Sequence, residues 1–73
     1  MAERPDDLKK LITVATDMGL SGELRTRATK LIGNINTHEA LLALLDLAAN
    51  EKLTKNEREL AIKYARDIIK SGH

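Results

Sequence analysis

The sequence predicts an all-α protein made of four antiparallel helices. Apolar residues recur at intervals of three and four along most of the chain, which is the spacing of one helix face. Ser or Thr stands immediately before three of these stretches, where helices are capped. The chain also matches itself when it is shifted by 33 residues, so one helical unit accounts for both halves.

The first two helices each have one apolar side. The first is predicted from Pro5, which suits the first helical position, to Gly19, which can end a helix. The second is predicted to follow the N-cap Ser21 and to end near Gly33 or Asn34. A narrow apolar stripe runs along this second helix, made of Leu24, Ala28, Leu31, Ile32 and Ile35.

The last two helices have wider apolar sides. Thr37 caps a third helix that is apolar almost all round, so we expect neighbours on every side of it. Residues 54–57 form a capping box that starts a fourth helix, which runs to about Lys70. The apolar residues of the fourth helix span roughly 200° of its circumference, more than a surface helix needs. They are Leu60, Ala61, Ile62, Tyr64, Ala65, Ile68 and Ile69.

The internal repeat is ungapped. Residues 8–35 pair with residues 41–68, and eight of the 28 pairs are identical, among them Arg25 with Arg58. The N-caps Ser21 and Thr54 and most apolar positions fall in register. Duplication of a helical hairpin explains this register better than chance similarity between two amphipathic helices.

We therefore expect one helical domain over residues 1–73, with repeat units at about 6–35 and 38–71. The two hairpins are expected to stack in the same orientation, with the third helix most buried. The alternative fold is an up-and-down four-helix bundle, in which the repeat reflects a heptad-like coincidence. A further alternative is that the chain is one piece of a longer solenoid, against which the Met1 start and the polar first helix argue.

Residues 24–35 resemble the second helix of a HEAT repeat. They are similar to the aliphatic-Arg-x-x-Ala-x-x-x-Leu-Gly-x-Ile pattern of the short HEAT repeats found in phycobilisome-lyase-like proteins, with Ile32 at the leucine position. Residues 36–45 look like the turn and first helix of the next repeat, and the resemblance covers residues 7–70. The fourth helix departs from the pattern, with Glu57 at the aliphatic position and Arg66 at the glycine position.

The resemblance implies a non-catalytic scaffold or protein-interaction module built from stacked hairpins. It also implies that the arginines of the motif, Arg25 and Arg58, pair with an acidic residue at the end of a first helix. Asp17, Asp46 and Asn50 are the candidates in this chain. The expected result is a structural ladder between hairpins.

Composition argues against several other function classes. The chain has no cysteine and only two histidines, so we expect no metal site, and we expect no cofactor. No nucleophile–His–acid set and no glycine-rich phosphate loop occur, so we do not expect an enzyme. No apolar run approaches the ~18 residues of a membrane span, and no signal-peptide pattern is present, so we expect a soluble cytoplasmic protein.

Ile62 and Ile69 lie on the outer flank of the fourth helix and are candidate partner-binding residues. A terminal repeat unit normally has a polar outer side, because no neighbour covers it. These two side chains therefore meet a second copy of the chain, meet a different protein, or lie under the C-terminal tail.

Lys30, Lys63, Arg66 and Lys70 are further candidate partner-binding residues, on the second and fourth helices. Their charge could attract an acidic protein surface or a phosphate backbone. Nucleic-acid binding is the alternative function. The single aromatic residue, Tyr64, and a pI of about 8.1 argue against it.

Overall fold

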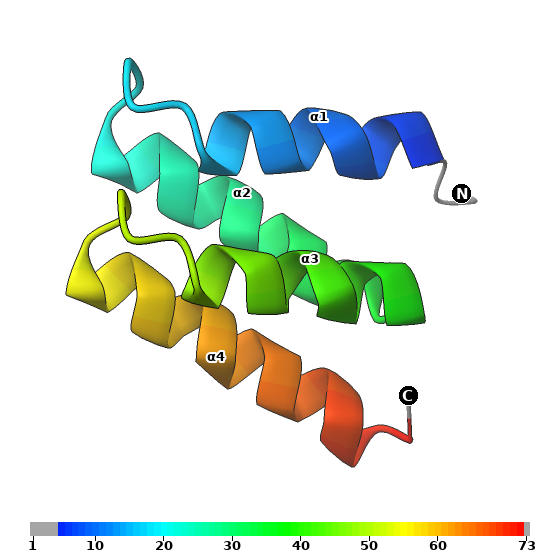
Figure 1. Cartoon of the computed structure of the whole chain (residues 1–73). Coiled ribbons are helices and arrows are strands. Elements are labelled where there is room, and N and C mark those ends of the chain that lie inside the picture. The colour runs from blue at the N-terminus through cyan, green and yellow to red at the C-terminus, as the bar shows by residue number, and fades with distance from the viewer. Residues whose placement is uncertain (1–4, 73) are drawn as a thin grey trace.

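The computed structural model describes residues 5–72 and confirms the all-α class and the four helices (Figure 1). The helices are α1 (Pro5–Ala15), α2 (Gly22–Ile35), α3 (His38–Ala48) and α4 (Lys55–Lys70). The Cα radius of gyration is 11.1 Å, close to the ~11 Å expected for a compact chain of this length. None of these helices combines the length and apolar character needed to cross a bilayer.

The predicted N-caps are confirmed. The side chains of Ser21, Thr37 and Thr54 each accept a hydrogen bond from the backbone N–H three residues further on, at 3.2, 3.1 and 3.2 Å. At Thr54 the capping box is complete, because Glu57 Oε1 accepts a hydrogen bond from the Thr54 N–H at 2.8 Å. These bonds satisfy N–H groups that have no partner inside the helix.

One predicted helix end is wrong and another is confirmed. α1 ends at Ala15 rather than at Gly19, because the Asp17 carboxylate accepts a hydrogen bond from the Gly19 N–H at 2.8 Å and holds the chain in a turn. α2 ends at Ile35, close to the predicted end near Gly33 or Asn34. It is closed by Asn36, whose φ of 58° is left-handed. Asparagine tolerates this conformation better than most residues.

The local geometry recurs after 33 residues. α1 and α3 start 33 residues apart, and so do α2 and α4. The connecting segments, 16–21 and 49–54, form similar turns in Figure 1. The Leu20 N–H donates to the Asp17 carbonyl at 3.1 Å, and the Leu53 N–H donates to the Asn50 carbonyl at the same distance.

The helices pack in two layers, with α1 beside α3 and α2 beside α4 (Figure 1). α1 also packs on α2, and α3 on α4. Within residues 5–72, α1 and α4 make no contact with each other. A closed up-and-down bundle would bring these two helices together. The alternative fold is therefore wrong for this part of the chain.

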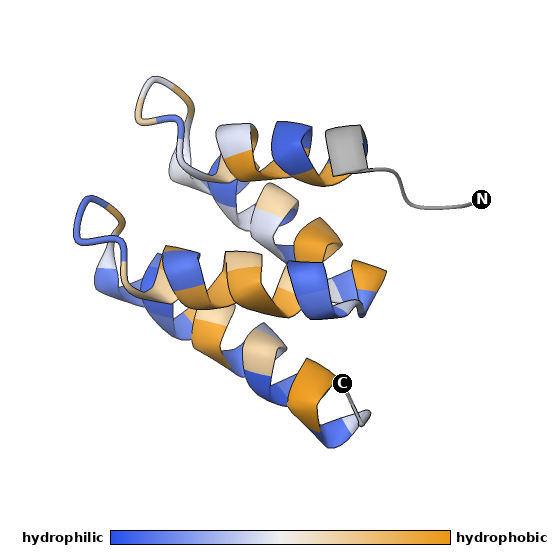
Figure 2. Ribbon diagram, turned by 45° about the vertical axis from the view of Figure 1, so that its right-hand side comes forward, coloured by the Kyte–Doolittle hydropathy of each residue, from blue (hydrophilic) through white to orange (hydrophobic). Residues whose placement is uncertain are grey.

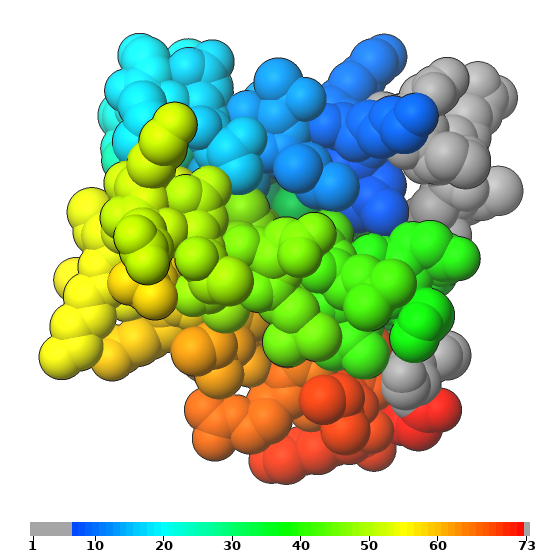
Figure 3. All heavy atoms as spheres, viewed as in Figure 1, coloured from blue at the N-terminus to red at the C-terminus, as the bar shows by residue number. Residues whose placement is uncertain are grey.

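α3 supplies the largest share of the core but is not enclosed on every side. Its buried residues are Ala40, Leu41, Ala43, Leu44 and Leu47. Leu42 and Leu45, however, are 50% and 45% exposed. Figure 2 shows hydrophobic residues along most of α3, and Figure 3 shows this helix at the front of the molecule with no helix over it. The prediction that neighbours surround α3 is wrong. The other three helices pack against its buried residues and leave the side with Leu42 and Leu45 uncovered within the described part of the chain.

The predicted apolar stripe of α2 is only partly buried. Ala28 and Ile32 belong to the core, whereas Leu24 and Leu31 are 42% and 52% exposed. The exposed pair lies on the side of α2 that no described helix covers. The first unit therefore exposes apolar side chains, although α1 itself has a polar outer side.

Candidate interaction surface

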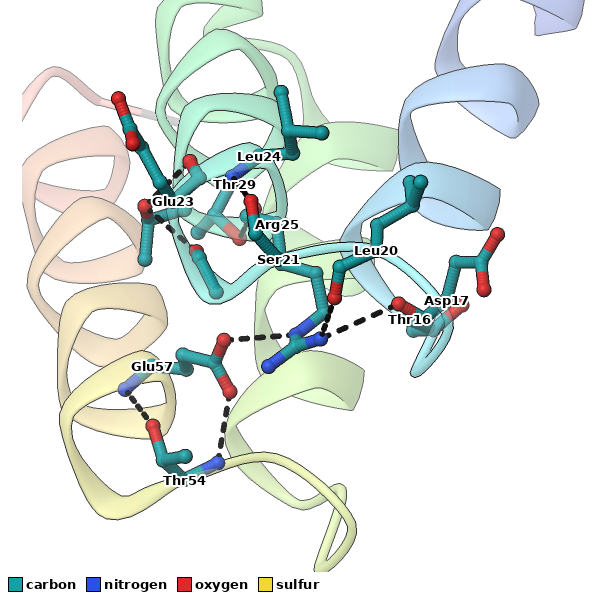
Figure 4. A network of polar contacts seen from close by, with 12 residues as sticks. Thr16, Asp17, Leu20, Ser21, Glu23, Leu24, Arg25, Thr29, Thr54 and Glu57 are labelled. Carbon is teal, nitrogen blue, oxygen red and sulfur yellow. Dashed lines mark hydrogen bonds and ion pairs between the residues drawn. The ribbon is translucent and has the colours of Figure 1, made fainter.

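A buried ion pair joins the two halves of the chain. Arg25 Nε donates to Glu57 Oε2 at 2.8 Å, and the two side chains are 12% and 6% exposed. The Arg25 Nη1 group donates to the backbone carbonyls of Leu20 and Asp17. Figure 4 shows Glu57 between Arg25 and Thr54. The acidic partner of Arg25 is thus Glu57, not the side chain of Asp17, Asp46 or Asn50 as predicted.

The electrostatics of Glu57 follow from this placement. Burial is the strongest single influence and raises the pKa of its carboxyl group. The hydrogen bond from the Thr54 backbone N–H and the bond and positive charge of Arg25 act in the opposite direction, and together they outweigh burial. The pKa therefore lies below its ordinary value, and Glu57 is a carboxylate at neutral pH.

One side of α2 is specialised for contact with α4. Gly22, Arg25, Thr29 and Gly33 share this side at helical spacing. A Cβ atom at Gly22 would lie 3.5 Å from Glu57 Oε2, and a Cβ at Gly33 would lie 2.8 Å from the ring of Tyr64. The two glycines therefore allow the helices to approach closely.

The matching side of α4 is covered by no other helix of residues 5–72. Shifted by 33 residues, the four α2 positions become Lys55, Arg58, Ile62 and Arg66. Ile62 is 44% exposed, whereas its counterpart Thr29 is 4% exposed. We call this side of α4 the open side. It replaces two glycines and a threonine by larger side chains, two of them cationic.

A groove opens at the N-terminal half of the open side, lined by Ala48, Lys55, Arg58, Glu59 and Ile62. Its volume is about 260 Å³, below the roughly 300–1,000 Å³ of typical small-molecule sites. The groove therefore suits one or two side chains of a partner. Arg58 Nε donates to the Ala48 carbonyl at 3.0 Å, which holds the guanidinium at the wall of the groove.

The residues predicted to bind a partner are exposed. Ile69 is 56% exposed, and residues 71 and 72, which are themselves exposed, leave both isoleucines accessible. Lys63, Arg66 and Lys70 are exposed on α4 at intervals of three and four residues, and so form one basic row. Lys30 is exposed on α2, at the position equivalent to Lys63. Only Ile62 among the predicted residues lines the groove.

Four surface residues were missed by the sequence prediction. Lys55, Arg58 and Glu59 line the groove. Leu45 is exposed on α3, although its counterpart Ile12 packs against the core. The 33-residue register contained the necessary signal, because the α2 positions that face α4 have counterparts on α4 that no other helix of residues 5–72 covers. What the sequence did not reveal is which side of α2 faces α4.

Other site types find no support within the described residues. Residues 7–72 hold no cluster of three or more His, Cys, Asp or Glu side chains able to bind a metal ion. His38 is exposed at the start of α3. Comparison with protein-family models finds no match to this chain, and comparisons with curated proteins and with solved structures find no significant match either.

Proposed function

We propose that this chain is a non-catalytic protein-interaction or scaffold module built from two stacked HEAT-like hairpins, residues 6–35 and 38–71. The recurrence of helix starts and turn hydrogen bonds after 33 residues supports the two-unit interpretation. The packing of α2 on α4 and of α1 beside α3 supports stacking in one orientation. We further propose that the module works in the cytoplasm.

The observation that carries the proposed function is the uncovered end of the second unit. Ile62, Ile69 and Leu45 are between 44% and 56% exposed there. Apolar side chains at the end of a repeat array are normally covered by a further unit or a partner. The partner is a second copy of the chain or another protein.

Light scattering at low and high salt tests this function, with the variant Ile62→Lys/Ile69→Lys as the comparison. Both side chains are largely exposed, so helicity by circular dichroism should be unchanged. A salt-resistant dimer that the variant abolishes would identify the partner as a second copy. If the chain is a monomer, it serves as bait, and a partner retained by the wild type should be lost by the variant. Identical masses and identical retained proteins for both chains would contradict the proposal.

Nucleic-acid binding is the second candidate, favoured by the basic row Lys63, Arg66 and Lys70 and by Lys30, all exposed. It predicts affinity for DNA or RNA that falls steeply as salt rises, with a slope set by the number of phosphate contacts. Exposed acidic residues on the same helix, Glu59 and Asp67, weaken the positive field. Absence of binding to duplexes and single strands at low salt would exclude this candidate.

A further inference from the structure

We propose that the groove on the open side of α4 binds a carboxylate side chain of an acidic partner protein, between Lys55 and Arg58 and against Ile62. This inference rests on the proposed function, because it specifies the chemistry of the partner. It concerns the groove and does not depend on Lys63, Lys70 or Ile69.

The first unit already contains such an arrangement. The positions equivalent to the groove lining are Ala15, Gly22, Arg25, Thr26 and Thr29. The carboxylate of Glu57 lies against this surface, 2.8 Å from Arg25 Nε and 3.5 Å from where a Cβ of Gly22 would be. The equivalent surface of the first unit is thus covered by a glutamate from the first turn of the adjoining helix α4.

Arg58 is prepared for a similar contact but lacks an acidic partner. Its Nε is fixed by the Ala48 carbonyl, and no carboxylate in residues 7–72 lies within ion-pair distance of its guanidinium. A guanidinium held in this way can present its remaining N–H groups to a carboxylate. Lys55 stands at the position equivalent to Gly22, where a Cβ would lie 3.5 Å from the Glu57 carboxylate, and adds a second cation.

The charges around the groove favour one bound carboxylate. Lys55 and Arg58 contribute two positive charges and Glu59 one negative charge, so the lining carries a net charge of +1. Arg66 lies two turns beyond Arg58 on the open side and adds to the positive potential. Ala48, the residue of α3 in the lining, is uncharged.

A second copy of the chain does not supply this carboxylate in the repeat register. The position of the first unit that matches Glu57 is Leu24, so stacking one copy on another would place a leucine opposite Arg58. A phosphate backbone also fits less well, because the groove includes the half-exposed Ile62 and the anionic Glu59. The occupant that matches both the apolar and the cationic lining is an acidic segment of another protein.

The test uses the full ¹⁵N-labelled chain and a helical, lactam-bridged peptide of residues 53–68. This peptide carries the capping box and Glu57, the sequence that fills the equivalent surface in the first unit. We expect chemical-shift changes at Ala48, Lys55, Arg58 and Ile62. A peptide with Glu57→Gln should bind at least fivefold more weakly.

Variants of the full chain complete the test. Arg58→Gln should weaken binding by a similar factor and remove the difference between the two peptides. Glu59→Gln should strengthen binding, because it removes the like charge from the groove. Lys10→Gln is the control: it removes an exposed cation of α1 that does not line the groove, and it should leave the affinity unchanged.

Three results would overturn the inference. They are equal affinity for the Glu and Gln peptides, no shift at the groove residues at millimolar peptide, and tighter Arg58-dependent binding of a DNA duplex than of the peptide. Equal affinity would leave the proposed protein-interaction function intact and would point to an apolar partner. The proposed function itself depends on the separate comparison with Ile62→Lys/Ile69→Lys.

Discussion

Replacing Glu57 by Gln should destabilise the protein by about 2 kcal/mol. Glutamine has a single acceptor oxygen, which can complete the capping box, but its NH2 group then faces the Arg25 guanidinium, so the substitution removes both the negative charge and the acceptor of the ion pair. A hydrogen bond to a charged group contributes about 1.5–3 kcal/mol, and Glu57 and Arg25 are both mostly buried. Arg25 retains its bonds to the Leu20 and Asp17 carbonyls, which places the expected loss in the lower part of that range.

Chemical unfolding followed by circular dichroism measures this loss, and the melting temperature should fall by about 8–16 °C. Arg25→Gln and the double variant complete a cycle, in which we expect a coupling energy of about 1–2 kcal/mol between the two side chains. Arg58→Gln is the internal control. Its guanidinium bonds only to the Ala48 carbonyl within the described residues, so it should lose about 1 kcal/mol.

A free energy of unfolding for Glu57→Gln within ~0.5 kcal/mol of the wild-type value, the range expected of an ordinary surface substitution, would contradict this role of the ion pair. Additive effects in the cycle would contradict it equally, because they would mean that the ion pair does not couple α2 to α4 energetically.

Three further predictions concern pH, close packing and a helix end. The lowered folded-state pKa of Glu57 means that the unfolded chain takes up this proton first as the pH falls, so the free energy of unfolding should decline from about pH 4.3 downward. Glu57→Gln should remove this part of the decline, and an identical acid profile for both chains would contradict the assignment. Gly33→Ala should destabilise the protein, because the new Cβ meets the Tyr64 ring at 2.8 Å; the cost of about 1–3 kcal/mol exceeds the ~1 kcal/mol gain in helix propensity. The Tyr64 Cβ also lies 2.9 Å from this position, so the same substitution should cost less in a Tyr64→Gly background, which removes both the ring and this Cβ; an unchanged cost would exclude the packing explanation. Asn36→Ala should cost about 1 kcal/mol, since alanine disfavours the left-handed conformation, whereas Asn36→Gly should be nearly neutral; equal unfolding midpoints for the two variants would count against this role.

The helix N-caps could be predicted because each depends on one short segment. Ser21 and Thr54 and the N–H groups they bind lie within one turn of the chain, so no distant residue changes the outcome. The partner of Arg25 could not be predicted in the same way. Sequence analysis assigned Glu57 entirely to the capping box, but a carboxylate has two oxygens, and the second reaches a residue 32 positions away.

Gly33 and Leu42 show two other features that could not be predicted from the sequence. A glycine late in a helix suggests a helix end, but Gly33 instead allows close approach of Tyr64, and the helix continues beyond it. Periodicity showed that the third helix is apolar on most sides without showing how many helices surround it, and Leu42 is half exposed as a result. Predicting the groove would have required both the 33-residue register and the direction in which α2 meets α4.

The packing also has a consequence for how quickly the chain folds. Most helix contacts join neighbours in sequence, α1 with α2 and α3 with α4, whereas the α2–α4 contact joins distant segments. Helical proteins dominated by such local contacts fold within microseconds to milliseconds. We expect each hairpin to form early and the two to dock late, so removing the Arg25–Glu57 pair should chiefly accelerate unfolding and leave the folding rate almost unchanged.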